Sequence, residues 1–132
     1  MAISANKFPK SSRLYLRKEI SELFESGKNF HQAPFKVIYK FLSGSNTPIR
    51  VTVAVPKRNI RLAVDRNRIK RQTREAYRLN CHDAKNYFEA QNLTVNLLLV
   101  FNSKVLPEYA VLQSKIILIL QRLKETHERN AI

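Results

Sequence analysis

Apolar and polar residues alternate along the first half of the chain with two different periods. Apolar side chains at helical spacing predict a short helix over residues 17–26, and Gly27 follows it where a C-terminal cap belongs. In residues 35–41 one face comprises Phe35, Val37, Tyr39 and Phe41 and the other Lys36, Ile38 and Lys40, which predicts a strand with one strongly aromatic face. Residues 51–55 predict a second strand, which Pro56 ends, and the turn-forming residues between the two strands favour a hairpin.

The second half of the chain combines helical patterns with one strongly apolar segment. A long helical stretch follows the second strand and includes residues 65–80. Residues 94–101, TVNLLLVF, are apolar nearly throughout, which is typical of a buried central strand. After Pro107, apolar residues three and four positions apart predict a C-terminal helix of about twenty residues that frays near Glu128. The order α-β-β-α-β-α predicts an α+β fold, a two-layer α/β sandwich with a small mixed sheet.

The length and the apolar content of the chain allow one domain. Of the 132 residues, 44% are apolar, which is enough for a single core. We expect that domain to cover residues 14–128, after a flexible basic N-terminal arm over residues 1–13 and before a tail over residues 129–132. The first 18 residues faintly resemble an organellar transit segment, but a basic arm explains the same residues and is the favoured interpretation. The single cysteine, Cys81, favours a reducing cytosol, and no apolar run reaches the roughly 20 residues of a membrane span.

The charge of the chain narrows the classes of partner. Lys and Arg number 24 against 10 Asp and Glu, so the formal net charge is +14. Such an excess favours nucleic acid, an anionic membrane surface or an acidic protein. The chain contains only 2 glycines, which excludes the glycine-rich loops that hold nucleotide phosphates through backbone amides. Phosphate recognition would therefore depend on side chains.

Much of the positive charge is concentrated between residues 57 and 78, which contain nine basic residues. A helix over residues 65–80, with Asp65 as its N-cap, would place one set of side chains on a core-facing side: Ile69, Thr73, Ala76 and Asn80. A basic stripe would cover an arc of about 100° on the opposite side, flanked by Arg66 and Arg68, and it comprises Asn67, Lys70, Arg71, Arg74 and Arg78. The repulsion within this stripe requires an anionic partner, and the predominance of Arg together with the aromatic strand favours RNA.

The sequence of this helix resembles a known family. The string AVDRNRIKRQTREAYR, residues 63–78, is similar to the signature helix of the bacterial ribonuclease P protein subunit, the partner of the ribozyme that trims the 5′ leader from precursor tRNA. The segments LRKEISELFESG and VAVPKR occur where that family has an N-terminal helix and a basic corner after a strand. The resemblance implies a ribosomal-protein-like fold with a left-handed β-α-β crossover, against the usual right-handed rule.

The resemblance also implies which residues bind RNA. The RNA-binding set carried over or placed on the stripe is Lys57, Arg58, Arg66, Asn67, Arg68, Lys70, Arg71, Arg74 and Arg78. A cleft between the first helix and the sheet is implied for the single-stranded leader, and the matching residues are Ile20, Phe24, Val37 and Tyr39. In this family the RNA catalyses hydrolysis with Mg²⁺ held mainly by the RNA and the substrate, so no catalytic residue and no metal ligand is expected in the protein. The location implied is the bacterial cytoplasm, and protein partners stay unknown.

Two positions depart from the family pattern. Ile20 replaces an aromatic residue, which weakens the expected base stacking, and the loop NIRL, residues 59–62, lacks the usual Gly-Asn. The neighbours Cys81, His82 and Asp83 point in different directions at a helix end and do not form a catalytic triad. A basic RNA-binding module of ribosomal or assembly-factor type, without a role in catalysis, is the alternative function. A membrane-surface binder would need a free amphipathic face, which the pattern does not show.

Overall fold

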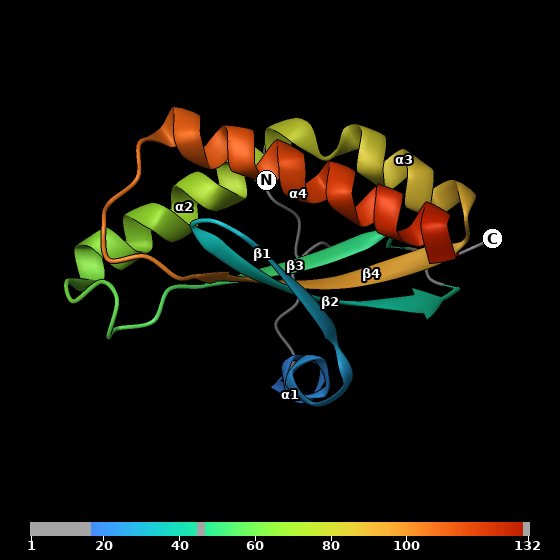
Figure 1. Cartoon of the computed structure of the whole chain (residues 1–132), viewed down its shortest axis with the longest axis horizontal. Coiled ribbons are helices and arrows are strands. Elements are labelled where there is room, and N and C mark those ends of the chain that lie inside the picture. The colour runs from blue at the N-terminus through green and yellow to red at the C-terminus, as the bar shows by residue number, and fades with distance from the viewer. Residues whose placement is uncertain (1–16, 45–46, 131–132) are drawn as a thin grey trace, which may run out of the picture.

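A four-stranded mixed sheet with helices on both faces forms the fold (Figure 1). The computed structural model describes residues 17–44 and 47–130, so the predicted N-terminal arm, residues 1–13, lies outside the described part of the chain. The predicted α+β class is confirmed, and all predicted helices and strands occur in the expected order, with one additional strand and one additional helix. In chain order the elements are α1 (Arg17–Ser26), β1 (Lys28–Gln32), β2 (Phe35–Ser43), β3 (Ile49–Ala54), α2 (Ala63–Asn80), α3 (His82–Ala90), β4 (Leu93–Phe101) and α4 (Tyr109–Asn130).

The strand order, β1-β2-β4-β3, differs from the predicted hairpin. β2 pairs antiparallel with β1 and with β4, whereas β3 pairs parallel with β4. The expected pairing of residues 35–41 with residues 51–55 is therefore wrong, because β4 lies between the two strands. Alternation identifies a strand but not its partner, and the true hairpin partner of β2, KNFHQ, is too polar to show a strand pattern.

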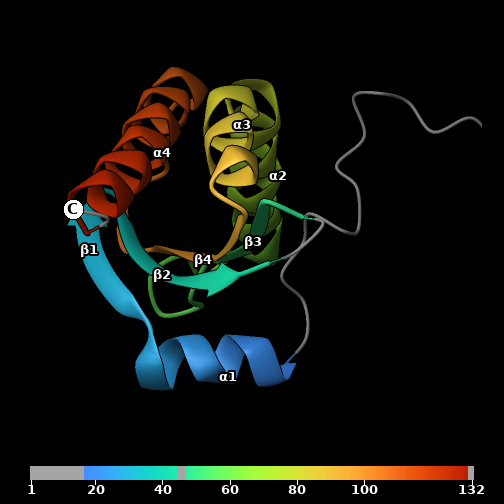
Figure 2. The same cartoon turned by 90° about the vertical axis from the view of Figure 1, so that its right-hand side faces the viewer.

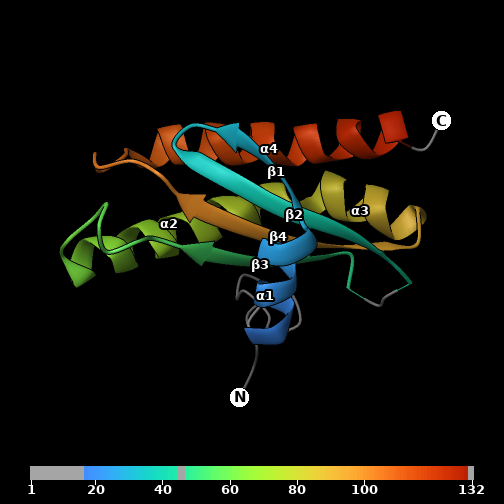
Figure 3. The ribbon, with the colours of Figure 1, turned by 60° about the horizontal axis from the view of Figure 1, so that its bottom comes forward.

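The connection from β3 through α2 and α3 to β4 is a crossover between parallel strands. In Figure 3 the α1 face is towards the reader, the helices of the crossover lie behind the sheet, and β3 and β4 both run towards the left with β4 above β3. This arrangement makes the crossover left-handed, as the family resemblance implied. Right-handed crossovers are the rule in parallel β-α-β units, so this hand is an unusual feature of the fold.

The two faces of the sheet bury unequal cores. α2, α3 and α4 cover one face, and α1 covers the other (Figure 2). Phe35, Val37 and Tyr39 belong to the larger core, beneath α2, α3 and α4. The residue between the last two, Ile38, belongs to a smaller cluster with Leu23 of α1 and Leu98 of β4. Successive residues of a strand point to opposite faces, so β2 supplies side chains to both cores. β4 is buried along most of its length, as expected for a central strand.

The long helical stretch after β3 is two helices rather than one. Cys81, with φ −89° and ψ −6°, ends α2 and directly precedes α3. α2 begins at Ala63 after Leu62, whose side chain makes no capping hydrogen bond, so the predicted N-cap at Asp65 is wrong. The main-chain N–H of Arg66 donates to the carbonyl oxygen of Leu62 at 3.0 Å, which places Asp65 inside the first turn. The C-terminal helix, α4, has 22 residues and extends beyond the predicted fraying point.

Gly27 allows α1 to approach the sheet closely. Its N–H donates to the carbonyl oxygen of Leu23 at 2.9 Å. A Cβ atom at this position would lie 2.4 Å from that oxygen and 3.0 Å from Cγ2 of Ile38. The backbone oxygen cannot move away without disturbing the last turn of α1.

We therefore predict that Gly27→Ala lowers the free energy of unfolding by about 1–3 kcal/mol, the usual cost of overpacking. Chemical denaturation followed by circular dichroism measures this change. Ser21→Ala, at an exposed position of the same helix, serves as the control and should change stability by no more than about 0.5 kcal/mol. Equal stability of the two variants would contradict the close approach of α1 to the sheet.

Candidate nucleic-acid interface

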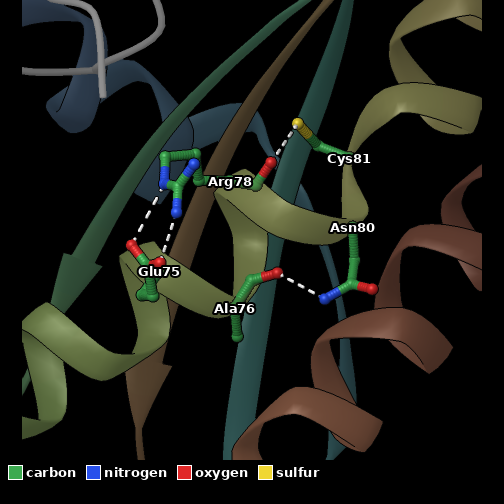
Figure 4. Close-up of polar contacts among 5 residues, drawn as sticks. All are labelled: Glu75, Ala76, Arg78, Asn80 and Cys81. Atoms are coloured by element: carbon green, nitrogen blue, oxygen red, sulfur yellow. Dashed lines mark hydrogen bonds and ion pairs between the residues drawn. The ribbon is translucent and has the colours of Figure 1, made fainter. Parts of the chain in front are cut away.

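The buried face of α2 is wider than the sequence pattern predicted. Ile69, Thr73 and Ala76 are buried as expected, and Tyr77 is buried beside them with 2% of its surface exposed. Asn80 is only half-buried, and its Nδ2 donates to the carbonyl oxygen of Ala76 at 2.8 Å (Figure 4). Tyr77 extends the buried arc towards the position of Lys70 on the helical projection. The basic stripe consequently lies beside the buried face, and not directly opposite to it.

Several polar side chains of α2 have no partner in the part of the chain that the structure describes. Asn67, Arg68 and Arg71 are exposed, and Lys70 is half-buried. None of these four side chains makes a hydrogen bond or an ion pair with the residues described. Their N–H donors are therefore available to a ligand, and an uncompensated row of cations on a helix favours an anionic one.

Arg66, the first basic residue of α2, has a structural contact instead. Its Nη1 donates to the carbonyl oxygen of Ile60 at 3.0 Å and to that of Arg61 at 2.7 Å. On a helical projection Arg66 lies within the buried arc between Thr73 and Tyr77. Because it belongs to the first turn, its long side chain folds back onto the preceding loop. Arg66 thus attaches the loop to α2 with part of its guanidinium group.

Arg78, the last basic residue of the predicted stripe, forms an ion pair with Glu75 (Figure 4). Its Nε donates to Oε2 of Glu75 at 3.0 Å, and Nη2 is close to Oε1. The hydrogen bond from Arg78 lowers the pKa of the Glu75 carboxyl, and the same bond raises the pKa of the arginine. The positive charge of Arg78 is therefore partly neutralised within α2, which separates it from the unpaired cations nearer the start of the helix.

The corner between β3 and α2 adds a second group of cations. Lys57, Arg58 and Arg61 are exposed and line an open hollow together with Leu62. Nδ2 of Asn59 donates to the carbonyl oxygen of Phe101 at 3.0 Å and ties this loop to the end of β4. The unusual sequence at residues 59–62 is thus well anchored.

Arg61 was not among the RNA-binding residues expected from the sequence. Arg61 belongs to the basic segment over residues 57–78, which could have identified it as a candidate. The family resemblance did not extend to its loop. The structure places Arg61 at the hollow with Lys57 and Arg58, next to the start of α2.

The four residues predicted to line a leader cleft do not lie together. Ile20 and Phe24 are on α1, and Phe24 has 64% of its surface exposed. Val37 and Tyr39 are 0% and 5% exposed and point into the larger core on the other face of the sheet. Their assignment to a cleft beside α1 is therefore wrong by one position along β2. The aromatic face of the strand suggested base stacking, but it is the face that α4 and its neighbours cover.

The face of β2 that lies towards α1 carries a different set of residues. Ile38 is buried against Leu23 of α1. Lys36 and Lys40 share this face with Ile38 because residues two apart along a strand point the same way. Nζ of Lys40 donates to Oγ of Ser26 at 3.2 Å, near the end of α1. Among the described residues, the surface beside α1 is therefore basic at its margins and presents the exposed ring of Phe24.

A family model described as Ribonuclease P matches residues 8–124. The chain belongs to the ribonuclease P protein family. It is 37% identical to a ribonuclease P protein component of Porphyromonas gingivalis over 105 residues, which cover 79% of this chain and 77% of the relative. It is 33% identical to the ribonuclease P protein component of Chlorobium phaeobacteroides over 122 residues, which cover 83% of this chain and 84% of the relative.

Solved structures of the same family share the fold. The RNase P protein from Thermotoga maritima superimposes with a TM-score of 0.66 at 21% identity, covering 83% of this chain and 96% of that one. The Staphylococcus aureus RNase P protein gives a TM-score of 0.64 at 18% identity, covering 87% and 97%. Membership of the family makes the chain a protein component of an endoribonuclease that processes tRNA.

The neighbours Cys81, His82 and Asp83 differ in their burial. Cys81 is buried, which raises the pKa of its thiol, whereas His82 and Asp83 are exposed. Across residues 17–44 and 47–130, no three His, Cys, Asp or Glu side chains gather where they could ligate a metal ion. No helix within these ranges has the length and apolar character needed to cross a membrane.

The contacts of α2 predict that alanine substitution of the two arginines of its signature affects stability to different extents. Arg66→Ala removes a donor from two backbone carbonyl groups, and we expect the free energy of unfolding to fall by about 1–2 kcal/mol. Arg68→Ala removes no contact within the described residues and should change it by at most about 0.5 kcal/mol. Urea denaturation of both variants measures the difference. A stability loss for Arg68→Ala equal to that for Arg66→Ala would contradict the separate roles.

Proposed function

We propose that the chain binds the RNA subunit of ribonuclease P through α2 and the corner before it, and that it also binds the 5′ leader of precursor tRNA. In this proposal the RNA catalyses removal of the leader, and the protein lowers the electrostatic cost of bringing RNA subunit and substrate together. The observation that carries the proposal is a set of cations that have no carboxylate partner among the described residues. They are Arg68, Lys70 and Arg71 on α2 and Lys57, Arg58 and Arg61 at the corner.

The arrangement of these cations suits a phosphate backbone. Asn67, Arg68 and Arg71 lie on the exposed side of a helix whose other side is fixed in the core by Ile69 and Ala76. The helix is rigid, so its arginines are presented at fixed spacing, and the planar guanidinium group can contact phosphate oxygens with two N–H groups. Each phosphate that is neutralised releases bound counterions, which makes such binding strongly dependent on salt.

The leader is assigned to the surface between α1 and the sheet. Phe24 offers an exposed ring on which an unpaired base can stack, and Lys36 and Lys40 supply positive charge on the neighbouring strand. Ile20 is half-buried on the same helix and contributes apolar contact rather than stacking. This assignment keeps the cleft implied by the family resemblance but replaces Val37 and Tyr39 with the residues that face α1.

The proposal leaves Mg²⁺ with the RNA subunit and the substrate. No step of the proposed function depends on a metal bound by the protein. The location proposed for this activity is the bacterial cytoplasm, where precursor tRNA is processed.

Reconstitution with a bacterial ribonuclease P RNA tests the proposal. At low Mg²⁺, adding the wild-type protein should stimulate cleavage of precursor tRNA. The double variant Arg68→Ala/Arg71→Ala should bind the RNA more weakly, with the slope of log affinity against log salt reduced by about two units if each arginine contacts one phosphate. Lys104→Ala, at an exposed position outside the interface, is the control. RNA binding without any stimulation of cleavage by the wild type would leave only the alternative of a basic module without a role in catalysis.

Substrates with and without a leader test the role of Phe24. We expect Phe24→Ala to weaken binding of leader-bearing precursor tRNA to the assembled enzyme by about fivefold to a hundredfold, since stacking on one base contributes about 1–3 kcal/mol. Binding of mature tRNA should not change. Val105→Ala removes an equally exposed apolar side chain from the loop before α4 and serves as the control. An equal loss for both substrates would place Phe24 outside the leader site.

A further inference from the structure

A second basic site lies at the edge of the sheet formed by β1. A hollow of about 290 Å³ is lined by residues of β1, β2 and α4: Asn29, Phe30, Tyr39, Arg122, Thr126 and Arg129. α4 stands above the β1 edge of the sheet, whereas α2 and α3 stand above the β3 edge (Figure 2). The hollow is therefore separate from the corner and from the cations of α2.

Arg122 is held in a defined orientation at this hollow. Its guanidinium carbon lies 4.2 Å from the centre of the Phe30 ring, and its Nη1 donates to the carbonyl oxygen of His31 at 3.2 Å. A guanidinium group has five N–H donors, so the bond to His31 leaves donors available. Since Phe30 itself is buried and tilts against Tyr39 at a centroid distance of 5.8 Å, the surface under the arginine is rigid. A cation fixed in this way loses little conformational entropy when it binds a ligand.

The other polar groups of the hollow favour an anion. Arg122, Thr126 and Arg129 are spaced four and three residues apart, so they share one face of α4. Arg129 is exposed and has no partner within the described residues. The Asn29 amide and the Tyr39 hydroxyl can donate, whereas the Thr126 hydroxyl already donates to the carbonyl oxygen of Arg122 at 2.7 Å.

The acidic residues between the two arginines do not neutralise this site. Glu125 and Glu128 both lie between Arg122 and Arg129 along α4, but neither is part of the lining of the hollow. In the part of the chain that the structure describes, neither arginine forms an ion pair with them. The hollow thus carries two uncompensated positive charges.

We infer that this hollow binds a phosphate group of an RNA strand, with Arg122 and Arg129 as its principal ligands. The inference rests on the proposed function, because the net charge of +14 and the cations of α2 make RNA the expected anion. A phosphodiester offers two oxygens to the fixed guanidinium fork, and the neighbouring aromatic surface accommodates the attached sugar or base. The protein then contacts RNA at both edges of its sheet.

Filter-binding titrations over a range of salt concentrations test this site in the full-length protein. One arm uses a bacterial ribonuclease P RNA alone, and the other uses precursor tRNA with the assembled enzyme, so the arms distinguish the source of the phosphate. Arg122→Lys keeps the charge but loses the planar fork. We expect about tenfold weaker binding in one arm, from the loss of a charge-assisted hydrogen bond. Arg129→Ala should reduce the salt slope of the same arm by about one unit.

The controls separate this inference from the proposed function. Lys124→Ala removes one positive charge from α4 outside the hollow and should bind as the wild type does. Because the Arg129 side chain has no described contact to lose, its variant reports on binding even if the Arg122 variant is less stable. Wild-type affinity and salt slope for both variants in both arms would overturn the inference, and would leave an acidic protein segment as the occupant to examine. Failure of the wild type to bind RNA would overturn the proposed function and this site with it.

Discussion

The pairing of β4 with strands on both of its sides is the constraint on which the rest of the structure depends. β4 lies between β2 and β3, and nearly all of its residues are buried. A strand buried on both faces needs cover from two layers. α1 covers one face through Leu23, and α2, α3 and α4 cover the other. The positions of α1 and α2, which carry the proposed leader and RNA contacts, both follow from this central strand.

The same burial explains how α2 can present so many positive charges. Cations four residues apart on a helix, such as Lys70 and Arg74, cost a few tenths of a kcal/mol for each pair. Full burial of one side chain such as Ile69 contributes about 1.5–3 kcal/mol. The free energy gained by burying Ile69, Ala76 and Tyr77 is therefore larger than the cost of repulsion between the cations on the exposed side. The buried side of α2 thus offsets much of the repulsion within the helix and fixes the direction in which its exposed arginines point.

The sequence predicted the helices and the central strand well, but it predicted poorly which strands pair with one another. Helical periodicity identified the buried positions Ile69, Thr73 and Ala76 because it depends only on local geometry. Strand pairing depends on residues far apart in the chain, and alternation in β2 could not show that β4 separates it from β3. The polar sequence of β1 hid that strand altogether. For the leader cleft, alternation correctly divided β2 into two faces but did not indicate which one lies beside α1.

The signature of the family is not chemically uniform in this chain. Arg66 is bound to two backbone carbonyl groups and Arg78 to Glu75, whereas Arg68 and Arg71 have no partner within the described residues. Arg66 fixes the loop before α2 through Nη1, and it thereby influences where Lys57, Arg58 and Arg61 lie. A sequence motif records both kinds of arginine in the same way. Only the hydrogen bonds distinguish an arginine that holds the loop before α2 from one whose donors remain available to a ligand.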